Sequence, residues 1–165
     1  MTKFNRREFG VLAGAGAMML AVRAGAESHG EPQVHEVRML NAHPDDRAQR
    51  NVFVPDIVRA KPGDTVRFIA EDRGHNAVAD ENMLPEGAEE FSGRINEEIE
   101  VVLEAEGTYG YYCQPHRGLG MVGLILVGDA SVNFEEAREA PQRGKAAERY
   151  EDIFARAEEL LAAEG

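Results

Sequence analysis

Short runs in which apolar and polar residues alternate, separated by turn residues, extend over residues 34–127. The clearest runs are 65–70 and 98–103, where every second side chain is apolar, as in a strand that buries one face. Lys61-Pro62-Gly63-Asp64 and Glu106-Gly107 are typical turn sequences. Further short runs occupy residues 34–40, 52–55, 57–60, 109–112 and 120–127. Many short strands with frequent turns predict an all-β sandwich.

The pattern changes after residue 130, where apolar residues recur at helical spacing. Asn133, followed by two glutamates, predicts the N-cap and acidic first turn of a short helix. Pro141 and Gly144 separate this helix from a second one. The second helix has an apolar stripe that we expect to pack on the sandwich, formed by Tyr150, Ile153, Phe154, Ala157, Leu160 and Leu161. The predicted domains are a β-sandwich over 27–130 and a helical extension over 131–165.

Residues 1–26 have the features of an export signal. The segment has a basic start, an apolar run over 11–22 and a small-residue cleavage site at Ala24-Gly25-Ala26. The apolar run is shorter than the roughly 20 residues that span a bilayer as a helix. Arg6-Arg7-Glu8-Phe9 favours the twin-arginine route, with general export or a retained anchor as alternatives. We therefore predict a periplasmic protein whose mature chain has no stable membrane insertion.

The chain has 30 acidic and 18 basic residues, which give a net charge of −12 at pH 7. The basic residues form no cluster beyond short pairs. This distribution argues against nucleic-acid binding, since phosphate recognition needs a basic surface. An acidic surface instead keeps a protein soluble and steers it toward cationic partners. The single cysteine, Cys113, excludes an intramolecular disulfide and leaves its thiol free for another role.

Four residues have the types and spacing of a copper site. Cys113, His116 and Met121 form a C-x2-H-x4-M motif, and His75 follows the strand predicted over 65–70. Two imidazoles and a thiolate, capped by a weak thioether, make a type 1 copper site. Four protein ligands leave no open position for a substrate. The pattern therefore predicts an electron carrier that binds one copper ion, and not an enzyme.

Each of these residues taken alone has a more ordinary interpretation. A lone cysteine or methionine is usually buried core, and a lone histidine is as often a loop residue as a ligand. Zinc is the competing metal, but structural zinc sites favour more thiolates and rarely include methionine. The remaining histidines, His29, His35 and His43, have no such setting, and we expect them at the surface.

Several stretches of the chain resemble the pseudoazurins, which are bacterial blue-copper proteins of the cupredoxin group. The matching stretches are Met39-Leu40-Asn41, Lys61-Pro62-Gly63-Asp64-Thr65-Val66, Gly74-His75-Asn76, Met83-Leu84-Pro85-Glu86-Gly87-Ala88, Ile95-Asn96-Glu97, Gly107-Thr108-Tyr109, Cys113-Gln114-Pro115-His116 and Gly120-Met121-Val122-Gly123. The resemblance implies an eight-stranded Greek-key sandwich with two C-terminal helices. It also implies that His75, Cys113, His116 and Met121 bind the copper, and that the Asn76 backbone N–H supports the thiolate.

The same resemblance implies a monomeric carrier with redox-protein partners: a nitrite or nitrous oxide reductase as acceptor and a cytochrome-type donor. We expect the electron to leave through the exposed edge of His116, within an apolar patch formed by Pro115, Leu119, Met83 and Leu84. Pseudoazurins usually surround this edge with lysines, whereas here lysine occurs only at positions 3, 61 and 145. Arg73, Arg94 and Arg117 are the candidates for a smaller cationic collar.

Two other functions are compatible with a copper-binding sequence. A copper storage or delivery protein usually has exposed segments rich in methionine and histidine, whereas the six methionines here are scattered. A fragment of a multicopper enzyme would carry His-x-His motifs for catalytic coppers, and the chain has none. Both features favour the electron carrier.

Overall fold

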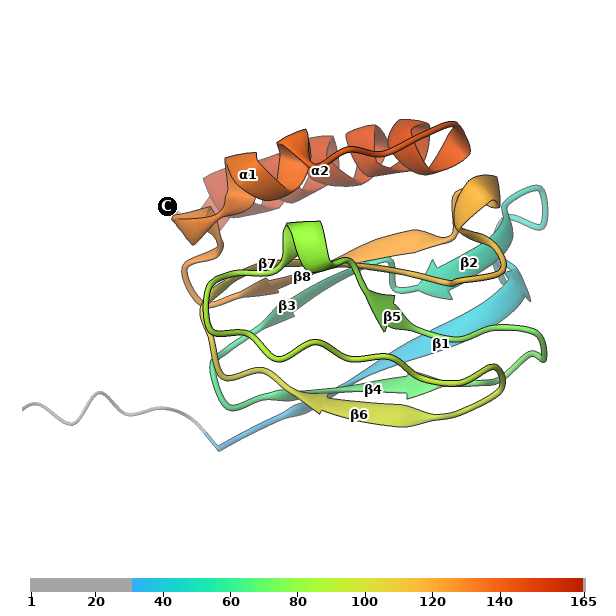
Figure 1. Ribbon diagram of the computed structural model, residues 1–165, viewed down its shortest axis with the longest axis horizontal. Coiled ribbons are helices and arrows are strands. Elements are labelled where there is room, and N and C mark those ends of the chain that lie inside the picture. Colours follow the sequence, from blue (N-terminus) through green and yellow to red (C-terminus); the bar gives the residue numbers. More distant parts are fainter. Residues whose placement is uncertain (1–30, 165) are drawn as a thin grey trace, which may run out of the picture.

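Two four-stranded sheets pack face to face, and two helices cover the outside of one of them (Figure 1). The computed structural model describes residues 31–164. The strand orders are β2-β1-β4-β6 and β3-β8-β7-β5. The elements are β1 (Val34–Ala42), β2 (Arg50–Val54), β3 (Ile57–Ala60), β4 (Thr65–Ile69), β5 (Val78–Ala79), β6 (Ile99–Val102), β7 (Gly107–Tyr112), β8 (Val122–Val127), the 3-10 helices η1 (Glu81–Met83), η2 (Arg117–Leu119) and η3 (Ala130–Val132), and the α-helices α1 (Phe134–Glu139) and α2 (Lys145–Glu164). The β-sandwich with two C-terminal helices is confirmed.

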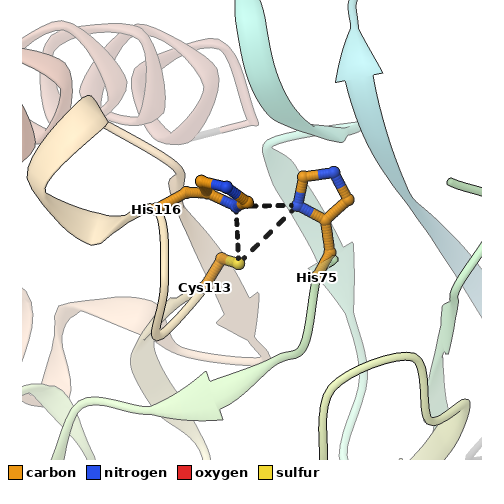
Figure 2. Close-up of side chains that lie close together, drawn as sticks. All are labelled: His75, Cys113 and His116. Atoms are coloured by element: carbon orange, nitrogen blue, oxygen red, sulfur yellow. Dashed lines mark hydrogen bonds between the residues drawn. The ribbon is translucent and has the colours of Figure 1, made fainter. Parts of the chain in front are cut away.

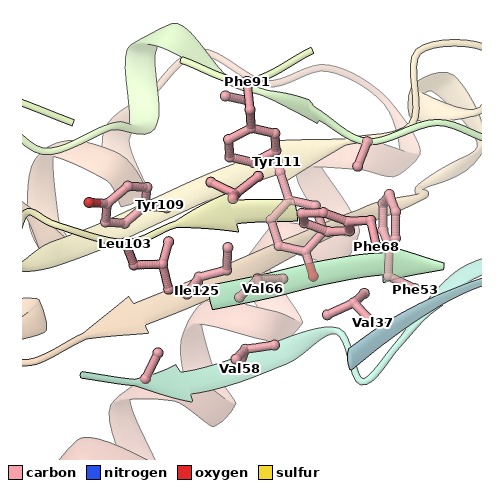
Figure 3. Packing of buried hydrophobic residues seen from close by; sticks show 14 of the residues in the cluster. Val37, Phe53, Val58, Val66, Phe68, Phe91, Leu103, Tyr109, Tyr111 and Ile125 are labelled. Carbon is pink, nitrogen blue, oxygen red and sulfur yellow. The ribbon is translucent and has the colours of Figure 1, made fainter. Parts of the chain in front are cut away.

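The core between the sheets is built from the inward-facing residues of each strand (Figure 3). Its centre is aromatic: the Tyr111 ring lies edge-on to Phe53 and Phe68, with centroids 4.8 and 5.0 Å apart. Phe68 belongs to β4 and Tyr111 to β7, so this contact joins the two sheets. His75 follows β4 and Cys113 follows β7. The aromatic contact therefore fixes the relative position of the strands that lead to two of the predicted ligands.

Strand β8 is buried on both faces, which explains why its sequence is an uninterrupted apolar run. Ile125 and Val127 face the core between the sheets. Leu124 and Leu126 point the other way and pack against the helices, together with Ile153 of α2. The helical extension therefore covers the β3-β8-β7-β5 sheet and adds a second core to the molecule (Figure 1).

Two details of the helical extension differ from the prediction. Asn133 stands at the N-cap position of α1, but its side chain makes no cap hydrogen bond. Its amide instead pairs with Thr108 of β7, accepting from the backbone N–H at 2.7 Å and donating to the carbonyl at 2.9 Å. Leu160 is 45% exposed, whereas Tyr150 and Ile153 of the same stripe are buried. Helical spacing therefore placed the stripe correctly as far as Leu161, which is partly buried against the second core, whereas Leu160 lies at the exposed edge of the stripe.

His35, which we expected at the surface, is partly buried. Its Nε2 lies 2.8 Å from Asp64 Oδ2, and its side chain is 24% exposed. Asp64 also accepts hydrogen bonds from the backbone N–H groups of Gln33 and Lys61. Burial raises the pKa of Asp64, but these hydrogen bonds outweigh burial and leave the pKa below its usual value of 3.8.

From the lowered pKa of Asp64, we expect the folded protein to lose stability in acid. Because its pKa is lowered on folding, its contribution is present above pH 4 and is lost as the pH falls through the folded-state value. Asp64→Asn should cost about 1.5–3 kcal/mol at neutral pH, the range for hydrogen bonds to a charged group. Urea unfolding of both proteins between pH 7 and pH 3 measures the difference. A difference that stays constant over this range would contradict the assignment.

The predicted export signal, including the paired arginines, lies outside the described residues. Within residues 31–164, no helix is both long and apolar enough to cross a membrane.

Candidate metal centre

The first predicted ligand, His75, is held in the turn between β4 and β5. Gly74 has a φ of 96°, a left-handed conformation that suits glycine, and its N–H donates to Asn96 Oδ1 at 2.6 Å. The backbone N–H of Asn96 in turn donates to the His75 carbonyl at 2.8 Å. His75 is fully buried, and its Nε2 lies 3.0 Å from Asn41 Oδ1. Because an amide oxygen only accepts, Nε2 carries the proton and Nδ1 presents a free lone pair.

The second and third ligands lie in one short loop after β7. The Cys113 backbone N–H donates to the Met121 carbonyl at 3.0 Å, and the Met121 N–H donates to the His116 carbonyl at 3.2 Å. The His116 N–H closes a turn onto the Cys113 carbonyl at 3.1 Å. These bonds fold residues 113–121 into a compact loop, which places His116 above Cys113.

Three donor atoms meet at one point in the structure (Figure 2). Cys113 Sγ lies 3.7 Å from His75 Nδ1 and 3.5 Å from His116 Nδ1. The two Nδ1 atoms are 3.1 Å apart. Bonds of about 2.0–2.3 Å from one central ion to nitrogen and sulfur would separate three trigonal ligands by about 3.5 Å. The spacing of the three side chains therefore fits a single ion in trigonal coordination.

Met121 also belongs to this region, since it is fully buried in the same core cluster as Cys113. Its backbone bonds to both Cys113 and His116, so its Cα lies within the ligand loop. The structure thus brings the sulfur of Cys113 and the two imidazoles together. Met121 lies beside them through its backbone hydrogen bonds within the ligand loop.

Burial acts in opposite ways on the two kinds of ligand, since it favours the neutral imidazole of His75 and disfavours the thiolate of Cys113. Burial lowers the pKa of His75, and the neighbouring His116 lowers it further, so the ring is kept neutral as a ligand must be. Burial raises the pKa of the Cys113 thiol, an effect that backbone N–H groups of Asn76 and His116 partly oppose. A thiol in this environment needs a bound cation to remain a thiolate. The soft sulfur and the neutral imidazoles are a donor set that suits copper.

Asn76 connects the ligand segments behind the site. Its buried side-chain Nδ2 donates to the Gly93 carbonyl at 2.9 Å, and its Oδ1 accepts from the Gln114 N–H at 2.8 Å. Its backbone N–H also lowers the pKa of the Cys113 thiol, against the effect of burial. Neither the side-chain role of Asn76 nor the Asn41 contact with His75 was predictable from the sequence. Neither contact leaves a periodic or spacing signal, because each joins residues 34 or 38 positions apart.

The apolar patch around His116 is smaller than predicted. Leu119 is 52% exposed and Pro115 is also exposed, beside a half-buried His116. Met83, by contrast, is 1% exposed and therefore cannot belong to the surface patch. Its side chain fills the space left by Gly110, where a Cβ would lie 2.6 Å from the methionine methyl carbon. Leu84 is partly buried against the core, so the exposed part of the predicted patch lies on the ligand loop itself.

The comparisons with known proteins agree with this geometry. Residues 42–128 match the copper-binding proteins of the plastocyanin/azurin family. The pseudoazurin of Paracoccus pantotrophus is 43% identical over 140 residues, covering 85% of this chain and 92% of the relative. The chain belongs to the pseudoazurin family.

Other pseudoazurins extend the match in sequence and in structure. The protein of Methylorubrum extorquens is 38% identical over 119 residues, covering 72% of this chain and 78% of the relative. The structure of a Sinorhizobium pseudoazurin superposes with a TM-score of 0.73 at 44% identity, covering 76% of this chain and 97% of that one. As a pseudoazurin, the chain is a blue-copper electron carrier with redox-protein partners, and not an enzyme.

Proposed function

We propose that the chain is a monomeric periplasmic electron carrier in which His75, Cys113, His116 and Met121 hold one copper ion. We further propose that it delivers single electrons to a denitrification reductase, such as nitrite or nitrous oxide reductase, and takes them from a cytochrome-type donor. The observation that carries the ligand assignment is the meeting of one sulfur and two imidazole nitrogens within 3.7 Å of one another. The bound copper supplies a one-electron couple between Cu(I) and Cu(II).

The protein residues perform three tasks in this proposal. His75, Cys113 and Met121 are fully buried, so they exclude water from the ion. The bonds from Asn41 and Asn76 hold His75 and the Cys113 loop in place, which limits rearrangement when the charge of the site changes. His116 is only half-buried and lies beside the exposed Leu119. It is therefore the ligand through which an electron reaches the surface.

Copper-loaded protein tests the site directly. We expect one bound copper per chain, an intense thiolate-to-copper visible band and a reversible one-electron couple. A preparation that binds zinc but gives no such band with copper would contradict the assignment. Rapid loss of Cu(I) to a competing acceptor would instead favour copper delivery.

Salt dependence identifies the partner. The chain is strongly acidic, with a net charge of −12, and opposite charges on a true partner would speed encounter. Because salt screens this attraction, the electron-transfer rate with the physiological acceptor should fall as ionic strength rises from about 0.01 to 0.15 M. A rate that rises with salt indicates repulsion between like charges and argues against that reductase as partner.

A further inference from the structure

A second polar cluster lies directly beside the ligand loop and contributes none of the four proposed ligands. Its centre is the carboxylate of Asp80, which is 3% exposed. One oxygen, Oδ2, accepts from Arg117 Nη2 at 2.6 Å and from Gln142 Nε2 at 2.8 Å. The other, Oδ1, accepts from the Asn82 N–H at 3.3 Å. A buried carboxylate needs this pairing, because an uncompensated charge is strongly unfavourable there.

The cation of this cluster belongs to the ligand loop. Arg117 follows His116 directly and begins η2. Its guanidinium carbon lies 4.2 Å from the centroid of the Tyr112 ring, and Tyr112 directly precedes Cys113. The Arg117 side chain therefore contacts the start of the loop while its backbone forms the middle of it.

The third member of the cluster comes from the helical extension. Gln142 lies in the linker between α1 and α2, and its Oε1 accepts from Arg117 Nη2 at 2.9 Å. Its amide nitrogen also lies 3.4 Å from the sulfur of the buried Met83. Three segments that are distant in sequence, η1, the ligand loop and the helix linker, thus meet at one ion pair.

His116 is the ligand whose ring is least restrained. The His75 ring is oriented by the 3.0 Å contact between its Nε2 and Asn41 Oδ1. Within residues 31–164, the His116 ring has no hydrogen-bond partner outside the cluster of ligand atoms. Its position therefore depends on the backbone of the loop, which Arg117 ties to Asp80.

We propose that Arg117 is a positioning residue for His116, and that the Asp80–Arg117–Gln142 cluster holds this ligand on the copper by fixing the loop to η1 and the helix linker. This inference rests on the proposed function, since it takes His116 as a ligand. The cluster also neutralises Arg117, so the residue does not act as a free cation in the predicted collar around His116.

Arg117→Gln tests the proposal. It removes the ion pair and the contact with the Tyr112 ring, so the loop loses its anchor. We expect Cu(I) to transfer to a chelator about 10-fold faster, in the range found when outer-shell partners of metal ligands are lost. We also expect a shifted visible band, and amide exchange of residues 114–120 about 10-fold faster in the copper-free protein. Arg117→Lys keeps the charge and should recover most of the wild-type release rate.

Arg138→Gln is the matched control. Arg138 also pairs with a carboxylate, Glu158, at 2.7 Å and lies 5.1 Å from the centroid of an aromatic ring, Phe134, but it belongs to α1. The Arg138→Gln substitution should leave copper release and the visible band unchanged, even where it lowers the melting temperature. If Arg117→Gln lowers the melting temperature alone, with wild-type release, spectrum and exchange, the residue is merely structural and the proposal is overturned.

The wild-type protein separates this inference from the proposed function. A wild-type sample without the blue band contradicts the ligand assignment itself. A normal wild-type band together with an Arg117→Gln variant that matches it contradicts only the role of Arg117.

Discussion

Cys113→Ser should abolish the intense visible band and the reversible one-electron couple. The band arises from charge transfer between a thiolate and copper, and Cys113 is the only cysteine of the chain. A serine hydroxyl remains protonated at neutral pH and is a poor ligand for Cu(I), which prefers soft sulfur. We expect copper affinity to fall by more than the roughly 10- to 100-fold that follows the loss of an outer-shell partner. Visible absorption, voltammetry and a copper titration measure these effects.

Met121→Leu is the informative companion to this substitution. It removes a sulfur from the same loop and keeps an apolar side chain of similar volume, so the core remains packed. The thiolate is still present, and the band should survive with a shifted potential, since the axial ligand tunes that potential. Survival of the band in Cys113→Ser, or its complete loss in Met121→Leu, would contradict the proposed roles of the two sulfur atoms.

The ligand set could be predicted because most of it is local in sequence. Cys113, His116 and Met121 lie within nine residues, and a short loop between two strands has few ways to arrange them. His75 could be added because it follows a clearly alternating strand, and the ends of strands in a sandwich meet at its edges. The structure places His75, Cys113 and His116 together, as the sequence indicated.

The contacts that orient the ligands were not predictable in the same way. Asn41 reaches His75 because β1 and β4 pair in parallel, and strand order has no signature in the sequence of either strand. The Asp80–Arg117 ion pair depends on how η1 is placed beside the loop, 37 residues away. Met83 was misplaced at the surface because an apolar residue in a loop has no periodic neighbours to indicate burial. Long-range polar pairing therefore limits sequence reasoning here more than hydrophobic patterning does.

Asn76→Ala should lower both the stability of the protein and the integrity of its copper site. The side chain is buried and supplies two hydrogen bonds, to the Gly93 carbonyl and from the Gln114 N–H. Removing it leaves two backbone groups without their partners, each at a cost of about 1–3 kcal/mol. We expect a total loss of about 2–4 kcal/mol in the free energy of unfolding, since water can reach part of the exposed loop. Urea unfolding of the copper-loaded protein measures it.

Asn133→Ala separates the two effects. Asn133 is a second buried asparagine, and its side chain also makes two backbone bonds, both to Thr108, at the base of the helical extension. The two substitutions remove the same chemical groups and should cost similar free energy. Asn76 directly follows His75 and accepts from Gln114, the residue after Cys113, whereas Thr108 is five residues before Cys113. Only Asn76→Ala should therefore shift the visible band and the potential. Equal spectra for the two variants would show that Asn76 stabilises the fold without tuning the site, whereas a shift confined to Asn76→Ala places it in the support of the thiolate.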